Sequence, residues 1–113
     1  MRNDHQRFLD ISESLALIQK YTNLGRAEFD ASELVQTWVL HHLQIIGEAS
    51  RAISAECKAK YPDVPWGKIN GMRNILVHQY FGVDGELIWS VVENDFPPLI
   101  ENIAQILDQS TTT

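Results

Sequence analysis

The spacing of the apolar residues is what most constrains the fold of this chain. Apolar side chains recur at steps of three or four residues along most of the sequence. This pattern is typical of amphipathic helices, and no strand is predicted. The sequence therefore predicts an all-α protein.

The first half of the chain predicts two helices. One runs from about residue 4 to residue 21 and ends at the Asn23-Leu24-Gly25 stop signal. The next starts at Asp30, which can form a capping box with Glu33, and runs to about Lys60. At about thirty residues this second helix would be long for a globular domain, so we expect it to bend.

The second half predicts the rest of a helical bundle. Asp63 is the candidate cap of a third helix, which has Pro65 in its first turn and should stop at Gly82. A fourth helix should run from about residue 84 to residue 95. A kink or break is expected at the prolines that follow, because proline cannot continue a helix without losing hydrogen bonds. The prediction is an antiparallel bundle of four to five helices, the last containing Leu99, Ile103, Ile106 and Leu107.

Length and composition indicate one cytoplasmic domain. The 113 residues fit a single domain, 1–113, of which we expect 110–113 to be frayed. No apolar run reaches the roughly 18 residues of a membrane span, and the polar start excludes a signal peptide. Cys57 is the only cysteine, so an internal disulfide and a Cys-based zinc site are excluded. No metal-ligand cluster of obvious spacing is visible, and no metal or cofactor is predicted.

The charge is unevenly distributed. The formal net charge is −6, which argues against indiscriminate binding of nucleic acids. Residues 84–108 contain six acids and no base, whereas basic residues gather in residues 51–80. Such a local basic patch suits a small anionic site or an RNA contacted at few phosphates, although it is also compatible with an ordinary solvated face. The basic residues are Arg51, Lys58, Lys60, Lys68 and Arg73.

Four polar side chains with distinct chemistry occur within eight residues. Arg73 is always charged and can hold a phosphate through a planar fork of donors. His78 is suited to proton transfer near neutral pH. Asn74 could orient His78 or donate to a phosphate oxygen, and Tyr80 adds a phenol. The segment thus has the minimum equipment for handling a phosphodiester, although an Arg and a His on one amphipathic helix are more often plain surface residues.

This string and the helical layout resemble the HEPN superfamily, and within it the HepT-type toxins. Arg73, His78 and Tyr80 match the motif R-x4-H-x-Y without a gap, and Asn74 matches the polar residue that commonly follows the Arg. The similarity spans most of the chain. Further matching segments are Gly47-Glu48-Ala49, Pro65-Trp66, Gly71-Met72, Phe81-Gly82-Val83-Asp84, Trp89 and Asp95-Phe96-Pro97.

The resemblance implies a fold, an activity and a partner. It implies a helical bundle that pairs through the motif helix as a homodimer or higher even oligomer, with one RNA-cutting cleft between the two motifs. It implies metal-independent endoribonuclease activity in a type VII toxin–antitoxin system, with Arg73 and His78 catalytic and Asn74 supporting. It also implies an MntA-like minimal nucleotidyltransferase as antitoxin, which neutralises the toxin by attaching AMP to Tyr80.

Helix geometry favours a site shared by two chains. Asn74 and His78, four residues apart, would share a helix face, as would Arg73 and Tyr80, seven apart. Arg73 and His78 would diverge by about 140° on an ideal helix. A two-fold dimer supplies a second Arg and a second His, so the spacing favours a composite site.

Several other residues receive structural interpretations. His41 and His42 are adjacent and so cannot share a metal from one helix. Glu48 is interpreted as a buried, hydrogen-bonded carboxylate, with a catalytic role as the alternative. Gly47 is the candidate site of a bend or of close helix contact. Whether the two histidines or Glu48 function is left open. The tryptophans are assigned to core or interface.

Two alternatives to a ribonuclease remain. The chain could be a non-catalytic HEPN module that binds nucleotide or a nucleotidyltransferase partner, or a structural helical dimer without a ligand. The complete Arg73/His78 pair favours the enzyme, because a pure binding module does not need the His.

Overall fold

The computed structural model describes residues 3–77 and 85–111, and of residues 72–77 and 110–111 it describes the backbone only. The described residues are helical and contain no strand, which confirms the all-α prediction. The elements are α1 (Asp4–Thr22), α2 (Arg26–Ala31), α3 (Glu33–Ala52), α4 (Ala55–Lys60), α5 (Trp66–Val77), α6 (Gly85–Ser90), the π-helix η1 (Val91–Asp95) and α7 (Phe96–Thr111).

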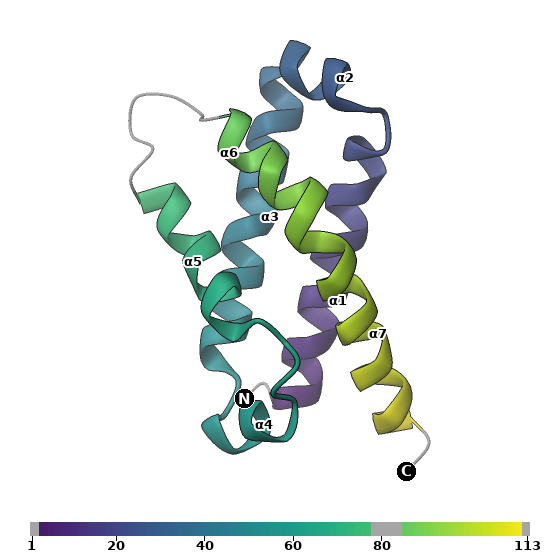
Figure 1. The fold of residues 1–113 in the computed structure, drawn as a ribbon, viewed down its shortest axis with the longest axis vertical. Helices are drawn as coiled ribbons and strands as arrows, with labels where there is room; N and C mark the ends of the chain where they lie inside the picture. The colour runs from purple at the N-terminus through teal and green to yellow at the C-terminus, as the bar shows by residue number, and fades with distance from the viewer. Residues whose placement is uncertain (1–2, 78–84, 112–113) are drawn as a thin grey trace.

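The helices form an elongated bundle around the antiparallel pair α1 and α3 (Figure 1). Helix α5 packs against α3 on one side, and the run from α6 to α7 crosses the bundle and packs on α1. The short helix α4 lies at the end of the bundle where α1 begins and α3 ends (Figure 1). Helix α5 thus packs mainly against α3.

The first helix agrees closely with its prediction. Asn3 and Gln6 form a capping box, in which each side chain accepts a hydrogen bond from the other residue's backbone N–H. Helix α1 ends at Thr22, and Gly25 follows with a φ of 99°, which only glycine adopts without strain. The buried apolar positions are Phe8, Ile11, Leu15 and Ile18, at steps of three or four.

The prediction of one long second helix is wrong, because the segment contains parts of three helices, α2, α3 and α4. The cap of α3 is Ser32, whose hydroxyl accepts from the backbone N–H of Val35, and Asp30 lies inside α2. Helix α3 ends at Ala52, since Ile53 has an extended backbone. Ser54 then caps α4. Two serine caps therefore replace the expected bend, and α3 runs through Gly47 without interruption.

The N-terminus of α1 is tied to the start of α4. The Asp4 carboxylate accepts hydrogen bonds from the Ser54 hydroxyl at 2.7 Å and from the Ser54 backbone N–H at 3.0 Å. These bonds, the hydroxyl first, hold the pKa of Asp4 below its usual range. The contact joins residues 50 apart in sequence.

The third helix begins later than predicted. The Pro65 carbonyl accepts the first helical hydrogen bond from the N–H of Ile69, at 3.1 Å, so Asp63 is not the cap. The backbone carbonyl of Asp63 instead accepts a hydrogen bond from Asn102 Nδ2 at 3.5 Å. The predicted stop at Gly82 lies outside the described residues.

Of the kink or break expected at Pro97 and Pro98, the break does not occur, and the helix is distorted into the π-helix η1 just before them. Helix α7 continues directly from α6 through η1 (Figure 1), and the Phe96 N–H donates to the carbonyl of Val91, five residues earlier. The π-helix also changes the spacing of the buried apolar residues by one position. The buried positions are Ile88, Val91, Phe96, Leu99, Ile103 and Ile106, and the one step of five falls within η1.

The core lies where α1, α3 and α7 meet. The largest fully buried side chains of the core come from every long helix, and α5 contributes Ile69. In the described part of the chain no helix is long and apolar enough to cross a membrane. The fully buried aliphatic and aromatic residues are Phe29, Phe96, Ile11, Ile18, Leu43, Ile46, Ile69, Ile88, Leu99, Ile103 and Val39.

Candidate active site on helix α5

The structure places two of the four predicted site residues on one helix. Arg73 and Asn74 lie in the second half of α5, where the backbone is described. His78 and Tyr80 lie outside the described residues. The assignment of roles to these four side chains therefore stays a prediction, and the structure bears on how α5 is held.

Helix α5 is held at its first turns. Ile69 is fully buried. Half-buried Trp66 donates from its indole N–H to the Tyr61 carbonyl at 3.0 Å, and its backbone N–H donates to the Val64 carbonyl at 2.8 Å. These contacts fix where the helix starts and which side faces α3. The position of residue 73 follows from them, because a helix propagates its register.

The side of α5 that faces the core can be followed along the helix as far as the motif residues. On a regular helix Arg73 lies about 40° around the axis from Ile69, and Asn74 lies about 140° from it. Arg73 therefore starts from the edge of the packed side, and Asn74 starts from the side that the exposed Gly67 shares.

The open side of α5 is built from small and amide residues. Among the described residues, a Cβ placed on Gly67 or on Gly71 would meet nothing within 4 Å. Asn70 is exposed between them, and its Oδ1 accepts a hydrogen bond from the buried Ser50 hydroxyl of α3 at 3.4 Å. Neither Ser50 nor Asn70 belongs to a recognisable spacing, so the sequence alone does not point to them.

The predicted basic patch is spread out. Lys68 is on α5, where its Nζ lies 3.7 Å from an Asp95 carboxylate oxygen and its side chain is 69% exposed. Lys58 and Lys60 are on α4, at the end of the bundle where α5 begins (Figure 1), and Lys58 Nζ lies 5.7 Å from the Trp66 ring centroid. Of these lysines, one is thus on α5 itself and two are on α4.

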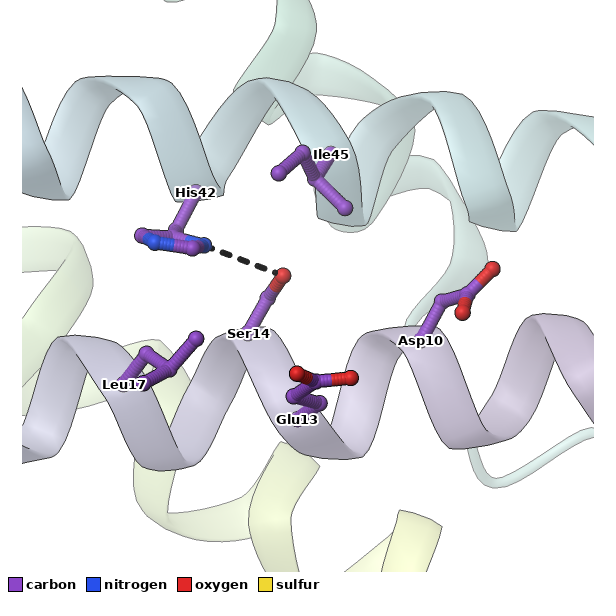
Figure 2. A pocket seen from close by; sticks show the side chains of 6 residues that line it. All are labelled: Asp10, Glu13, Ser14, Leu17, His42 and Ile45. Atoms are coloured by element: carbon purple, nitrogen blue, oxygen red, sulfur yellow. Dashed lines mark hydrogen bonds between the residues drawn. The ribbon is translucent and has the colours of Figure 1, made fainter.

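A second polar cluster lies between α1 and α3, away from the motif. Figure 2 shows the ring of His42 between the two helices, with Nδ1 3.2 Å from the Ser14 Oγ. His42 and Ser14 are buried, and among the described residues His42 Nε2 has no hydrogen-bond partner. They line a cavity of about 380 Å³ together with Asp10, Glu13, Leu17 and Ile45.

The remaining singled-out residues divide between surface and core. His41 is exposed, whereas burial lowers the pKa of the neighbouring His42. Glu48 is exposed and accepts from Gln44 Nε2 at 3.2 Å, so the expectation of a buried carboxylate is wrong. Gly47 is buried on α3. Within residues 3–77 and 85–111, no group of three or more His, Cys, Asp or Glu side chains is placed to hold a metal.

The comparisons with known proteins agree on one family. The family described as "Ribonuclease HepT-like" matches residues 11–106. A "Gamma-glutamylcyclotransferase and putative RNase" of Methanocaldococcus jannaschii is 40% identical over 111 residues, which cover 96% of this chain and 50% of that protein. The chain therefore spans half the length of this relative.

Two shorter relatives match along nearly their whole length. A "Putative RNase" of the same organism is 38% identical over 90% of this chain and 95% of its own length. A "Probable ribonuclease HepT" of Thermococcus cleftensis is 38% identical over 88% of this chain and 92% of its own. No solved structure matches the chain. The family match and these relatives place the chain in the HepT-like ribonuclease family of the HEPN superfamily.

Proposed function

We propose that this chain is the toxin of a toxin–antitoxin pair and cleaves RNA as a metal-independent endoribonuclease. One observation carries the proposal. The string Arg73-x4-His78-x-Tyr80 is complete and begins on α5, in a chain that matches a ribonuclease family over residues 11–106. The string supplies a phosphate-binding cation and a proton-transfer group, which are the two functions that phosphodiester cleavage needs.

The reaction can be written with these groups alone. His78 takes the proton of a ribose 2′-hydroxyl, and the 2′-oxygen attacks the adjacent phosphorus. The bond from phosphorus to the 5′-oxygen breaks, and that oxygen receives a proton from the imidazolium that has formed. Arg73 stabilises the negative charge that develops on the non-bridging oxygens. The products are a 2′,3′-cyclic phosphate and a 5′-hydroxyl. Asn74 supports the site by donating to the phosphate or orienting His78.

We propose that two copies of the chain form one site. Arg73 and His78 diverge by about 140° on a regular helix, so a second copy can supply the missing partner. The assembly would be a homodimer or a higher even oligomer, with the two 73–80 segments at the interface.

The proposed antitoxin is an MntA-like minimal nucleotidyltransferase that transfers AMP to Tyr80 in the cytoplasm. Each AMP adds a phosphodiester charge and a bulky base two residues from His78. Both oppose the entry of RNA phosphates. A nucleotidyltransferase gene beside the gene for this chain would support the pairing.

The decisive experiment measures cleavage of labelled RNA by purified protein in excess EDTA. We expect wild-type protein to cut, and Arg73→Ala and His78→Ala each to lose ~10²-fold or more in rate. His5→Ala is the matched control, because His5 is exposed at the start of α1. Circular dichroism verifies that all variants remain helical.

Two results would change the proposal. Cleavage that stops in EDTA and returns with Mg²⁺ would refute the metal-free mechanism. Cleavage by His78→Ala near the wild-type rate would refute the role of His78. If the wild-type protein does not cut RNA but binds a nucleotidyltransferase, the non-catalytic binding module becomes the better account.

A further inference from the structure

A hydrogen bond between α3 and α5 orients the side chain of Asn70 next to the motif. The hydroxyl of Ser50, which is fully buried on α3, donates to Asn70 Oδ1 at 3.4 Å. Asn70 is itself exposed. With its oxygen engaged by Ser50, the amide keeps two N–H donors for groups outside the bundle. The bond therefore turns an exposed asparagine into an oriented donor.

Helix geometry puts this donor between the two described motif positions. Asn70 precedes Arg73 by about 4.5 Å and Asn74 by about 6 Å along the axis of a regular helix. Around the axis it lies between them, about 60° from Arg73 and about 40° from Asn74. Asn70 therefore lies about one turn before the two motif positions, on the side of α5 that faces between them.

The surroundings of Asn70 suit a polyanion. Helix α5 contains no Asp or Glu, so the helix itself presents no negative charge to repel phosphates. Gly67 and Gly71, on either side of Asn70, leave the helix backbone open to close approach. RNA phosphates are pure acceptors, and asparagine N–H groups are among the donors that proteins use to bind them.

We propose that Asn70 binds an RNA phosphate beside the one that Arg73 holds, and that Ser50 is its positioning residue. The inference rests on the proposed ribonuclease function and extends its site by one phosphate. It names the sugar–phosphate backbone as the ligand and assigns no base specificity. A purely structural Asn70, which would only help to hold α5 on α3, is the competing account.

Two substitutions of Asn70 separate the two accounts, because each account predicts a different order for the effects of these substitutions. Asn70→Asp keeps an oxygen that accepts from Ser50 but replaces the N–H donors with negative charge. Asn70→Ala removes both. If Asn70 binds phosphate, Asn70→Asp weakens RNA binding more than Asn70→Ala. If it only holds the helix, Asn70→Ala should lower the Tm more than Asn70→Asp, since the charged oxygen still accepts from the Ser50 hydroxyl.

The measurement is RNA affinity in the full-length His78→Ala protein, which binds fluorescein-labelled RNA without cutting it. We expect Asn70→Ala to raise Kd about tenfold, and Asn70→Asp to raise it about tenfold more. Ser50→Ala should raise Kd less than Asn70→Ala, since the donors remain but lose their orientation. Asn23→Asp at the exposed end of α1 repeats the charge change away from α5 and should leave Kd within twofold.

The outcomes are distinct from failure of the proposed function. Wild-type protein that does not cut RNA removes the ribonuclease proposal, and the role of Asn70 falls with it. Wild-type protein that cuts, with Asn70→Asp binding RNA as well as or better than Asn70→Ala, overturns the Asn70 proposal alone. Thermal melting of each variant, which should stay within a few degrees because Asn70 is exposed, verifies that the order reflects binding.

Discussion

The buried imidazole of His42 should make the stability of the protein fall as the pH drops below about 6.5. His42 is 6% exposed, accepts from or donates to Ser14 Oγ at 3.2 Å, and packs against the Trp38 ring with centroids 4.5 Å apart. Burial lowers the pKa of His42, the neighbouring His41 lowers it further, and the Glu13 carboxylate opposes both. Imidazolium is the form that burial penalises.

The sign and the size follow from linkage. An unfolded His has a pKa near 6.5, so below that pH the unfolded chain binds a proton that folded His42 does not bind. The free energy of unfolding then decreases as the pH falls from about 6.5 toward the lowered folded pKa. In that window one proton contributes a slope of at most about 1.4 kcal/mol per pH unit. Below the folded pKa the contribution is constant.

The assay is urea unfolding followed by circular dichroism at pH 7.5, 6.5, 5.5 and 5.0. His42→Gln removes the titration and keeps a polar side chain, so the difference in slope between wild type and variant isolates His42. The absolute stability of the variant does not matter, provided that it folds. Equal pH dependence in the two proteins would refute the argument that His42 is held neutral in the α1–α3 interface.

Three further substitutions test the packing and the proposed regulation. Ile69→Ala, at a fully buried position, should cost about 2–5 kcal/mol in urea unfolding, and a loss below 1 kcal/mol would mean that α5 is not held there. Asp4→Ala should cost about 1 kcal/mol, seen as a lower Tm, because Ser54 loses its acceptor. Tyr80→Phe should gain no AMP by intact mass after incubation with the nucleotidyltransferase and ATP, and additions equal to wild type would exclude Tyr80.

The sequence predicted helices better than it predicted their ends. Apolar spacing located α1 and the helical character of the rest, because each helix must bury one face. Breaks at Ser32 and Ser54 were missed, since Asp30 and Glu33 offered a competing cap signal and serines also occur inside helices. The proline break failed for another reason. Local chemistry disfavours Pro97 in a helix, but η1 accommodates it.

The candidate site was predictable only as far as short-range spacing reaches. Arg73 and Asn74 were correctly expected on a helix, because the motif and the helix are local in sequence. The Ser50–Asn70 bond joins residues 20 apart, and it depends on how α5 docks on α3. The buried state of His42 likewise depends on α1. No single-sequence pattern encodes such pairings, so they had to come from the structure.

The π-helix η1 makes one place in the chain tolerant of a change in length. Removing one residue from an α-helix rotates every later side chain by about 100° and exposes part of the core. Within η1 the same deletion would convert the π turn into an α turn and reduce the step from Val91 to Phe96 from five residues to four. Ile88 and Leu99 would stay on the same buried face. The chain can therefore change by one residue at η1 while the residues of α7 keep the same buried face. We expect one-residue insertions and deletions in this family to occur most often at this position.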